Sequence, residues 1–211
     1  MDSKSNYFED LKVIKKVMEE SSRFLSLSGL SGIFAGIIAL IGAAIAILGF
    51  MNGGILFVDG YTTGMSSHDI AVLKSEFFID AILVLIFALA FSFFFSIRKS
   101  ASKGLKMWTP VSRRLLINLM IPLFTGGILI LILYFQDQWQ FIIPLMLIFY
   151  GLALVNAGKF TYNEVFYLGL SEIITGLVSA VFPVYGLFFW CFGFGLLHIA
   201  YGLIMYRKYE I

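Results

Sequence analysis

The sequence predicts an all-α polytopic membrane protein with six transmembrane helices and a short N-terminal amphipathic helix on the cytoplasmic side. Its 211 residues are 60% hydrophobic and only 13% charged, and the mean hydropathy of +0.93 is far from that of a soluble domain. Apolar runs long enough to span a bilayer recur six times. We therefore expect a cytoplasmic arm over residues 1–23 and one transmembrane domain over residues 24–211.

The six apolar runs have the length of membrane-spanning helices, which need about 20 residues. The first run is longer than the apolar core of a signal peptide and lacks a cleavage-like break, so we expect the mature chain to begin at Met1. The predicted spans are Phe24–Phe50, Phe77–Ile97, Leu115–Phe135, Phe141–Ala157, Val165–Phe182 and Tyr185–Tyr206.

The placement of lysine and arginine predicts the orientation of the spans. Every lysine and arginine except Lys74 falls in the N-terminal arm, in the second-to-third or fourth-to-fifth connection, or after the sixth run. Cytoplasmic loops carry an excess of these residues, so both termini are predicted to be cytoplasmic. The net charge of +2 is thus a topology signal, and it gives no indication of nucleic-acid binding.

The arm has the pattern of an amphipathic helix. Asn6 and Glu9 have the spacing of a capping box, and apolar residues from Phe8 to Met18 recur at helical intervals. Its acidic residues balance its lysines, which disfavours a dedicated anchor for anionic lipid. We expect the arm to dock on the bundle, pair between copies in a homo-oligomer, or bind a protein partner on the cytoplasmic face.

Small residues predict close helix packing, which holds membrane helices together where hydrophobicity gives no preference between protein and lipid. On the first span they recur at three- and four-residue spacing and predict a contact that is either internal or between protomers. On the fourth and sixth spans, Tyr150-Gly151 and Phe194-Gly195 are similar and hint at a hairpin repeat. The packing glycines are Gly29, Gly32, Gly36, Gly151, Gly195 and Gly202.

Glu172 and His198 are the acid and the imidazole that the apolar runs place inside the membrane. Thr161 and Glu164 have capping-box spacing, which would start the fifth helix and put Glu172 about 12 to 14 Å from its cytoplasmic end. His198 lies at the same depth on the sixth run. In an antiparallel hairpin turning at Pro183–Gly186, Glu172 faces His198, Thr175 faces Gly195 and Ser179 faces Cys191.

Two interpretations of this pair remain open. A lone carboxylate at this depth costs about 2.5 to 3.5 kcal/mol, so pairing or a wet cavity is expected. The pair is either a hydrogen-bonded clamp that fixes helix register or a protonatable ligand or ion site that opens toward the cytoplasm. In the second case the polar neighbours at similar depth are Thr175, Asn118, Asn156, Ser28 and Ser31.

Enzyme templates and cofactor sites fit the sequence poorly. The stretch Gly169-Leu170-Ser171-Glu172 lacks the second glycine of a nucleophile elbow. Two histidines, one cysteine and the scattered donors Asp59, His68 and Asp69 give no metal-binding spacing. We therefore expect no catalytic residue, no metal and no cofactor.

Four segments carry a resemblance to a known family. They are Arg23–Gly32, Arg114–Asn118 with Pro122, Phe149–Ala157 and Gly195–His198. Together they resemble a six-span family of Bacteroidota inner-membrane proteins of uncharacterised activity, and the glycine-rich hairpins are faintly similar to HdeD-type proteins. The resemblance implies a bacterial inner (cytoplasmic) membrane and transfers no site.

The sequence thus favours a non-enzymatic sensor, binding or regulatory protein with a polar site inside the membrane. The alternative is a small solute, ion or proton-linked transporter or channel using the same site. An intramembrane hydrolase is the least favoured class.

Overall fold

The computed structural model describes residues 23–52, 67–104 and 106–211. These residues are helical, with no strand among them, and six of their helices are long and apolar enough to cross a membrane. This confirms the predicted all-α polytopic fold. The predicted helix of the arm, and Asp59 of the connection after the first span, lie outside the described residues.

The six spans are built from ten helical elements, two of which are short 3-10 turns and one of which is a π-helix. The first five spans are α2 (Gly29–Asn52), α3 (Ser67–Ser102), α4 (Pro110–Phe135), η1 with α5 (Trp139–Phe141, Ile142–Gly158) and α6 (Asn163–Val181). The sixth span joins η2 (Pro183–Tyr185), α7 (Gly186–Trp190), the π-helix η3 (Cys191–Leu197) and α8 (His198–Tyr209).

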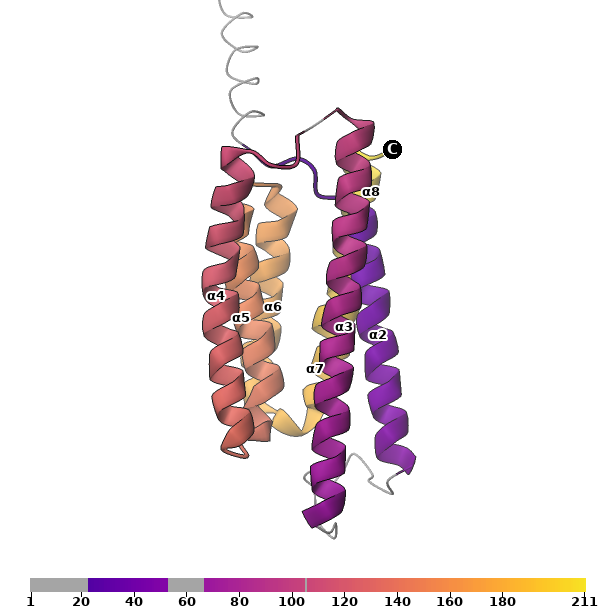
Figure 1. The fold of residues 1–211 in the computed structure, drawn as a ribbon, viewed down its shortest axis with the longest axis vertical. Coiled ribbons are helices and arrows are strands. Elements are labelled where there is room, and N and C mark those ends of the chain that lie inside the picture. Colours follow the sequence, from indigo (N-terminus) through magenta and orange to yellow (C-terminus); the bar gives the residue numbers. More distant parts are fainter. Residues whose placement is uncertain (1–22, 53–66, 105) are drawn as a thin grey trace, which may run out of the picture.

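The helices form two groups of three. In the first, the α5 unit, α5 packs between α4 and α6; in the second, the α2 unit, α2 packs between α3 and the sixth span. Figure 1 shows α4, α5 and α6 on one side and α2 and α3 on the other, with α7 between them. The units meet along a seam where the sixth span contacts α6 and α5.

Glycines bring the helix backbones of each unit close together. A Cβ on Gly151 of α5 would lie 2.6 Å from the carbonyl oxygen of Gly169 of α6, and one on Gly202 of α8 would lie 2.6 Å from that of Gly29 of α2. Only residues without a side chain fit at these crossings. Gly32 and Gly36 face the sixth span as well, so the small-residue face of the first span packs within one chain.

The first span begins at Gly29 instead of at the predicted Phe24. The Glu210 carboxylate accepts hydrogen bonds from the Gly29 N–H, at 2.6 Å, and from the Ser28 hydroxyl, at 3.2 Å. A carboxylate at this position satisfies the free N–H groups of a helix start. Lys99 of α3 forms an ion pair with Glu210 at 3.2 Å and donates to the Leu27 carbonyl at 2.5 Å.

The residues before α2 are held by the connection between α5 and α6. Thr161 Oγ1 donates to the Phe24 carbonyl at 2.6 Å, and the Tyr162 hydroxyl donates to the Leu25 carbonyl at 2.9 Å. Burial raises the pKa of Tyr162 to about 12, which keeps this hydroxyl a donor. The predicted Thr161–Glu164 capping box is therefore wrong: Tyr162 is the N-cap of α6, without a side-chain hydrogen bond.

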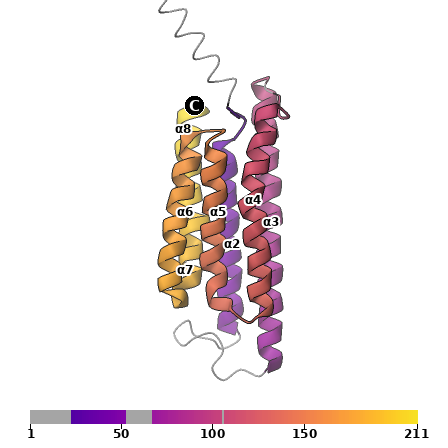
Figure 2. The same ribbon diagram turned by 90° about the vertical axis from the view of Figure 1, so that its left-hand side faces the viewer.

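Two of the four ion pairs among the described residues lie at one end of the bundle, which we call the basic end. It carries Arg23, Lys99, Lys159 and Lys208, and Figure 2 shows the end of α8 and the connection between α5 and α6 at this end. At the opposite end, Lys74 of α3 pairs with Asp137 in the connection between α4 and α5. The hydrogen bond from Lys74 lowers the pKa of Asp137, so this link between the units is charged at neutral pH.

Candidate functional site

Glu172 lies at the midpoint of α6, nine residues from each end of the helix. At 1.5 Å per residue this is about 13.5 Å from either end, in the middle of a bilayer core. The side chain is fully buried, with 0% exposure. The carboxyl group is thus enclosed by protein at the depth where water is scarcest.

His198, the first residue of α8, contacts Glu172 across the seam. The distance from His198 Nδ1 to Glu172 Oε1 is 3.3 Å, and the histidine side chain is 6% exposed. The sequence register placed these two residues opposite one another. The structure adds that α6 packs mainly on α5 while α8 packs mainly on α2, so the contact joins the two units.

The surroundings of His198 define its tautomer. Nδ1 lies 3.1 Å from the carbonyl oxygen of Gly193, and Nε2 lies 2.8 Å from the hydroxyl of Tyr150. A backbone carbonyl only accepts hydrogen bonds, so Nδ1 carries a proton. Nε2 then accepts from Tyr150 when the ring is neutral and donates to it when the ring is charged.

The Glu172 carboxyl group makes no hydrogen bond to the described residues, although it lies within ion-pair distance of His198. The Nδ1–H bond is directed at Gly193 instead. A Cβ on Gly193 would lie 2.6 Å from Glu172 Oε2, so the absence of a side chain at Gly193 makes room for the carboxyl group. Buried polar groups without partners are costly and mark sites with a bound species or a function.

A π-helix shapes the face of the sixth span that meets Glu172. It covers Cys191–Leu197 and ends where His198 begins α8. The wider turn lets the His198 ring reach the carbonyl oxygen of Gly193, five residues earlier. Such π-helical segments occur frequently at functional sites. The rings of Tyr150 and Phe194 lie 5.4 and 6.0 Å from that of His198 and enclose it on its apolar side.

Of the other predicted site residues, Thr175 alone shares the buried face of α6 with Glu172. Its hydroxyl donates to the Ser171 carbonyl at 2.8 Å. Asn118 and Asn156 each donate to a carbonyl of their own helix, four residues earlier. Ser28 donates to Glu210, and Ser31 donates to the Ser28 carbonyl at 2.5 Å. The structure therefore does not bring these last four residues to the pair.

Sequence reasoning missed Tyr150 and Gly193 as parts of the site. Tyr150 belongs to α5, and its partnership with His198 depends on how three helices pack. The similarity of Tyr150-Gly151 to Phe194-Gly195 was the available signal, because both aromatic residues lie against His198. Gly193 carried no signal of its own within a glycine-rich segment.

Ser179 is a further buried polar group on the same face of α6. Its side chain has 0% exposure, and its hydroxyl has no hydrogen-bond partner among the described residues. Among all the residues that the structure describes, no group of three His, Cys, Asp or Glu residues could hold a metal ion. The chemistry that Glu172, His198 and Tyr150 offer is proton exchange and hydrogen bonding.

The fold and the site define an α-helical polytopic membrane protein with a buried carboxyl–imidazole pair between two helical units. No protein-family model matches the chain, and neither the curated proteins nor the solved structures compared with it gave a match.

We predict that Glu172→Gln and His198→Ala are energetically coupled. Each side chain loses its neighbour when the other is replaced, so the double variant loses less stability than the sum of the single variants. The expected coupling is about 1 kcal/mol in a double-mutant cycle of unfolding free energies in detergent. Glu172→Gln combined with Asn118→Ala is the control and should be additive. Additivity of the Glu172 and His198 changes as well would contradict a direct contact.

We also predict that Gly193→Ala lowers the unfolding free energy by about 1 to 3 kcal/mol, because its new methyl group overlaps Glu172 and Leu147. Gly127→Ala is the matched control, since a Cβ there meets nothing within 4 Å. Alanine at that helical position should be neutral or stabilising. Equal losses in the two variants, measured by thermal unfolding, would show that Gly193 has no special role beside the carboxyl group.

Proposed function

We propose that this protein is a non-enzymatic membrane regulator that binds a proton between its two helical units and couples that proton to their packing. The observation that carries the proposal is the Glu172 carboxyl group. It is fully buried, has no hydrogen-bond partner among the described residues and lies 3.3 Å from His198 of the other unit.

The electrostatic cost of burial favours a proton on the Glu172–His198 pair while the two units are packed together. With a neutral imidazole beside it, an ionised Glu172 is an isolated charge in a region of low dielectric, which costs several kcal/mol. One proton on the pair removes the net charge, whether it resides on the acid or on the ring. The titratable groups in contact at the seam are Glu172 of α6, His198 of α8 and Tyr150 of α5. Loss of the proton therefore favours opening of the seam and entry of water.

The sixth span connects this site to the basic end. Near the end of α8, Lys208 forms an ion pair with Glu164 of α6 at 2.6 Å, and Glu210 just beyond it accepts from Gly29 of α2. A displacement of α8 at the seam changes contacts with both units at that end. A second copy of the chain or a protein partner that binds there would then sense the state of the pair.

We further propose a bacterial inner membrane with both termini in the cytoplasm. The segregation of Arg23, Lys99, Lys159 and Lys208 at one end supports this orientation. The resemblance to six-span Bacteroidota inner-membrane proteins supports the compartment.

A proton-linked transporter or channel is the second candidate. The observation that favours it is the position of the pair, midway along the spans and between two units of three helices. Transporters that alternate access place their sites near the bilayer midplane between rocking halves. Here the seam would have to open to each side in turn.

The two candidates differ in proton flux, and both require that stability depend on pH through Glu172. For the regulator, the melting temperature of the wild type should depend on pH through Glu172, because the folded and unfolded states place this carboxyl group in different surroundings. The dependence should be weaker in Glu172→Gln and unchanged in Glu76→Gln, a control at an exposed site.

A second experiment measures proton flux in vesicles that contain the protein and an internal pH dye. For the regulator, these vesicles should dissipate an imposed pH gradient no faster than protein-free vesicles. A flux that Glu172→Gln abolishes would overturn the regulator and support the transporter. Parallel pH profiles for the wild type and Glu172→Gln would contradict both, because neither could then rest on a proton held by this carboxyl group.

A further inference from the structure

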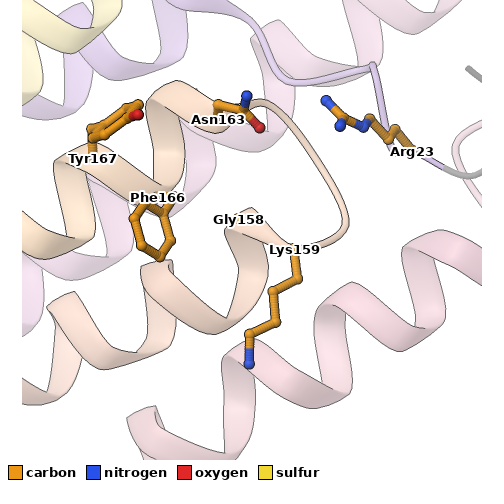
Figure 3. A pocket seen from close by; sticks show the side chains of 6 residues that line it. All are labelled: Arg23, Gly158, Lys159, Asn163, Phe166 and Tyr167. Carbon is orange, nitrogen blue, oxygen red and sulfur yellow. The ribbon is translucent and has the colours of Figure 1, made fainter. Parts of the chain in front are cut away.

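A cavity of about 310 Å³ opens at the basic end of the bundle, apart from the Glu172–His198 pair. It lies where α5 ends and α6 begins, beneath the segment that leads into α2. Figure 3 shows the residues that line it: Arg23, Gly158, Lys159, Asn163, Phe166 and Tyr167.

The charge of this lining is positive. Arg23 and Lys159 each contribute a cationic side chain, and none of the six lining residues is acidic. Among the described residues, the Arg23 guanidinium has no hydrogen-bond or ion-pair partner, and in Figure 3 it reaches toward Asn163. Lys159 donates to Asn156 at 3.1 Å, and Figure 3 shows its side chain directed away from Arg23 and Asn163.

The acid next to the lining is paired with α8. Glu164 follows Asn163 in the first turn of α6, but it accepts from Lys208 at 2.6 Å and from Tyr209 at 3.2 Å. Arg23 and Asn163 therefore offer hydrogen-bond donors to a phosphate group, and Lys159 adds a second positive charge nearby.

The cavity is amphipathic along the direction of the helices. Lys159 and Asn163 lie where the candidate span Trp139–Gly158 stops and the candidate span Asn163–Val181 starts, and Arg23 lies before α2. Phe166 and Tyr167 follow toward the middle of the bilayer, with 38% and 64% of their surfaces exposed. A phosphate at the polar end would thus be followed by apolar surface, as a phospholipid requires and a free phosphate does not.

From these observations we propose that the cavity binds the phosphate group of an anionic phospholipid, with Arg23 and Lys159 as the residues that recognise it. A zwitterionic headgroup is disfavoured because its ammonium would find no carboxylate in the lining. This site does not depend on the state of the Glu172–His198 pair.

The test measures lipid affinity of the purified full chain in detergent by native mass spectrometry, with phosphatidylglycerol and phosphatidylcholine of the same acyl chains. Wild-type protein should prefer phosphatidylglycerol. Arg23→Gln and Lys159→Gln should each weaken its binding about fivefold without changing phosphatidylcholine binding, because one cation near a membrane surface contributes that much. Arg23→Lys should retain most of the affinity.

Arg113→Gln is the matched control, since Arg113 is exposed near the start of α4 and does not line the cavity. An equal loss of phosphatidylglycerol binding in this control would overturn the site, because attraction would then be a general property of the basic end. Equal affinity of wild-type protein for the two lipids would overturn it as well. A third outcome is thermal stabilisation by inorganic phosphate at constant ionic strength without a preference for phosphatidylglycerol. This outcome would overturn the proposal of a lipid ligand and assign the cavity to a soluble phosphate.

Discussion

The carboxyl group of Glu172 sets the strictest physical condition on this structure. It lies at the midpoint of a span, fully buried, and no hydrogen bond from the part of the chain that the structure describes offsets its desolvation. Three features of the bundle accommodate it: the side-chain-free surface at Gly193, the imidazole of His198 and the π-helix that places the two together. Each would be an unnecessary irregularity in a bundle held by apolar packing alone.

The contacts within each unit differ in kind from those between the units. Within a unit, backbones approach so closely at Gly151 and Gly169, or at Gly29 and Gly202, that a methyl group would overlap a carbonyl oxygen. Between the units, the seam is formed by the broken sixth span and a polar pair. Dispersion at close crossings depends little on pH, whereas the pair depends on a proton. The seam is therefore the part of the fold that a proton can control.

Much of the fold and part of the site could be predicted from the sequence. Hydropathy identifies the six spans because burial in lipid requires long apolar helices. Register along two consecutive spans is enough to place Glu172 opposite His198. The pairing of α6 with α5 and of α8 with α2 is a long-range property of packing, so the sequence does not reveal that this contact joins two units or that Tyr150 completes it.

Hydropathy also fails at the start of the first span. Phe24 and Leu25 are apolar, but their carbonyl groups accept hydrogen bonds from Thr161 and Tyr162, and the helix begins at Gly29 where Glu210 caps it. Glu210 is 181 residues away from Gly29 in the sequence. Local patterns cannot report such a cap. For the same reason, Thr161 and Glu164 had the spacing of a capping box while their side chains bind other segments.

The protonation of His198 tests the central claim most directly. In nitrogen NMR of ring-labelled protein in detergent, His68→Asn would leave His198 as the single histidine, since the chain has two. The structure predicts a proton on Nδ1, held by the Gly193 carbonyl, and ring signals that shift in Glu172→Gln. A ring protonated on Nε2 alone, or signals identical in the two proteins, would contradict a proton bound between the units.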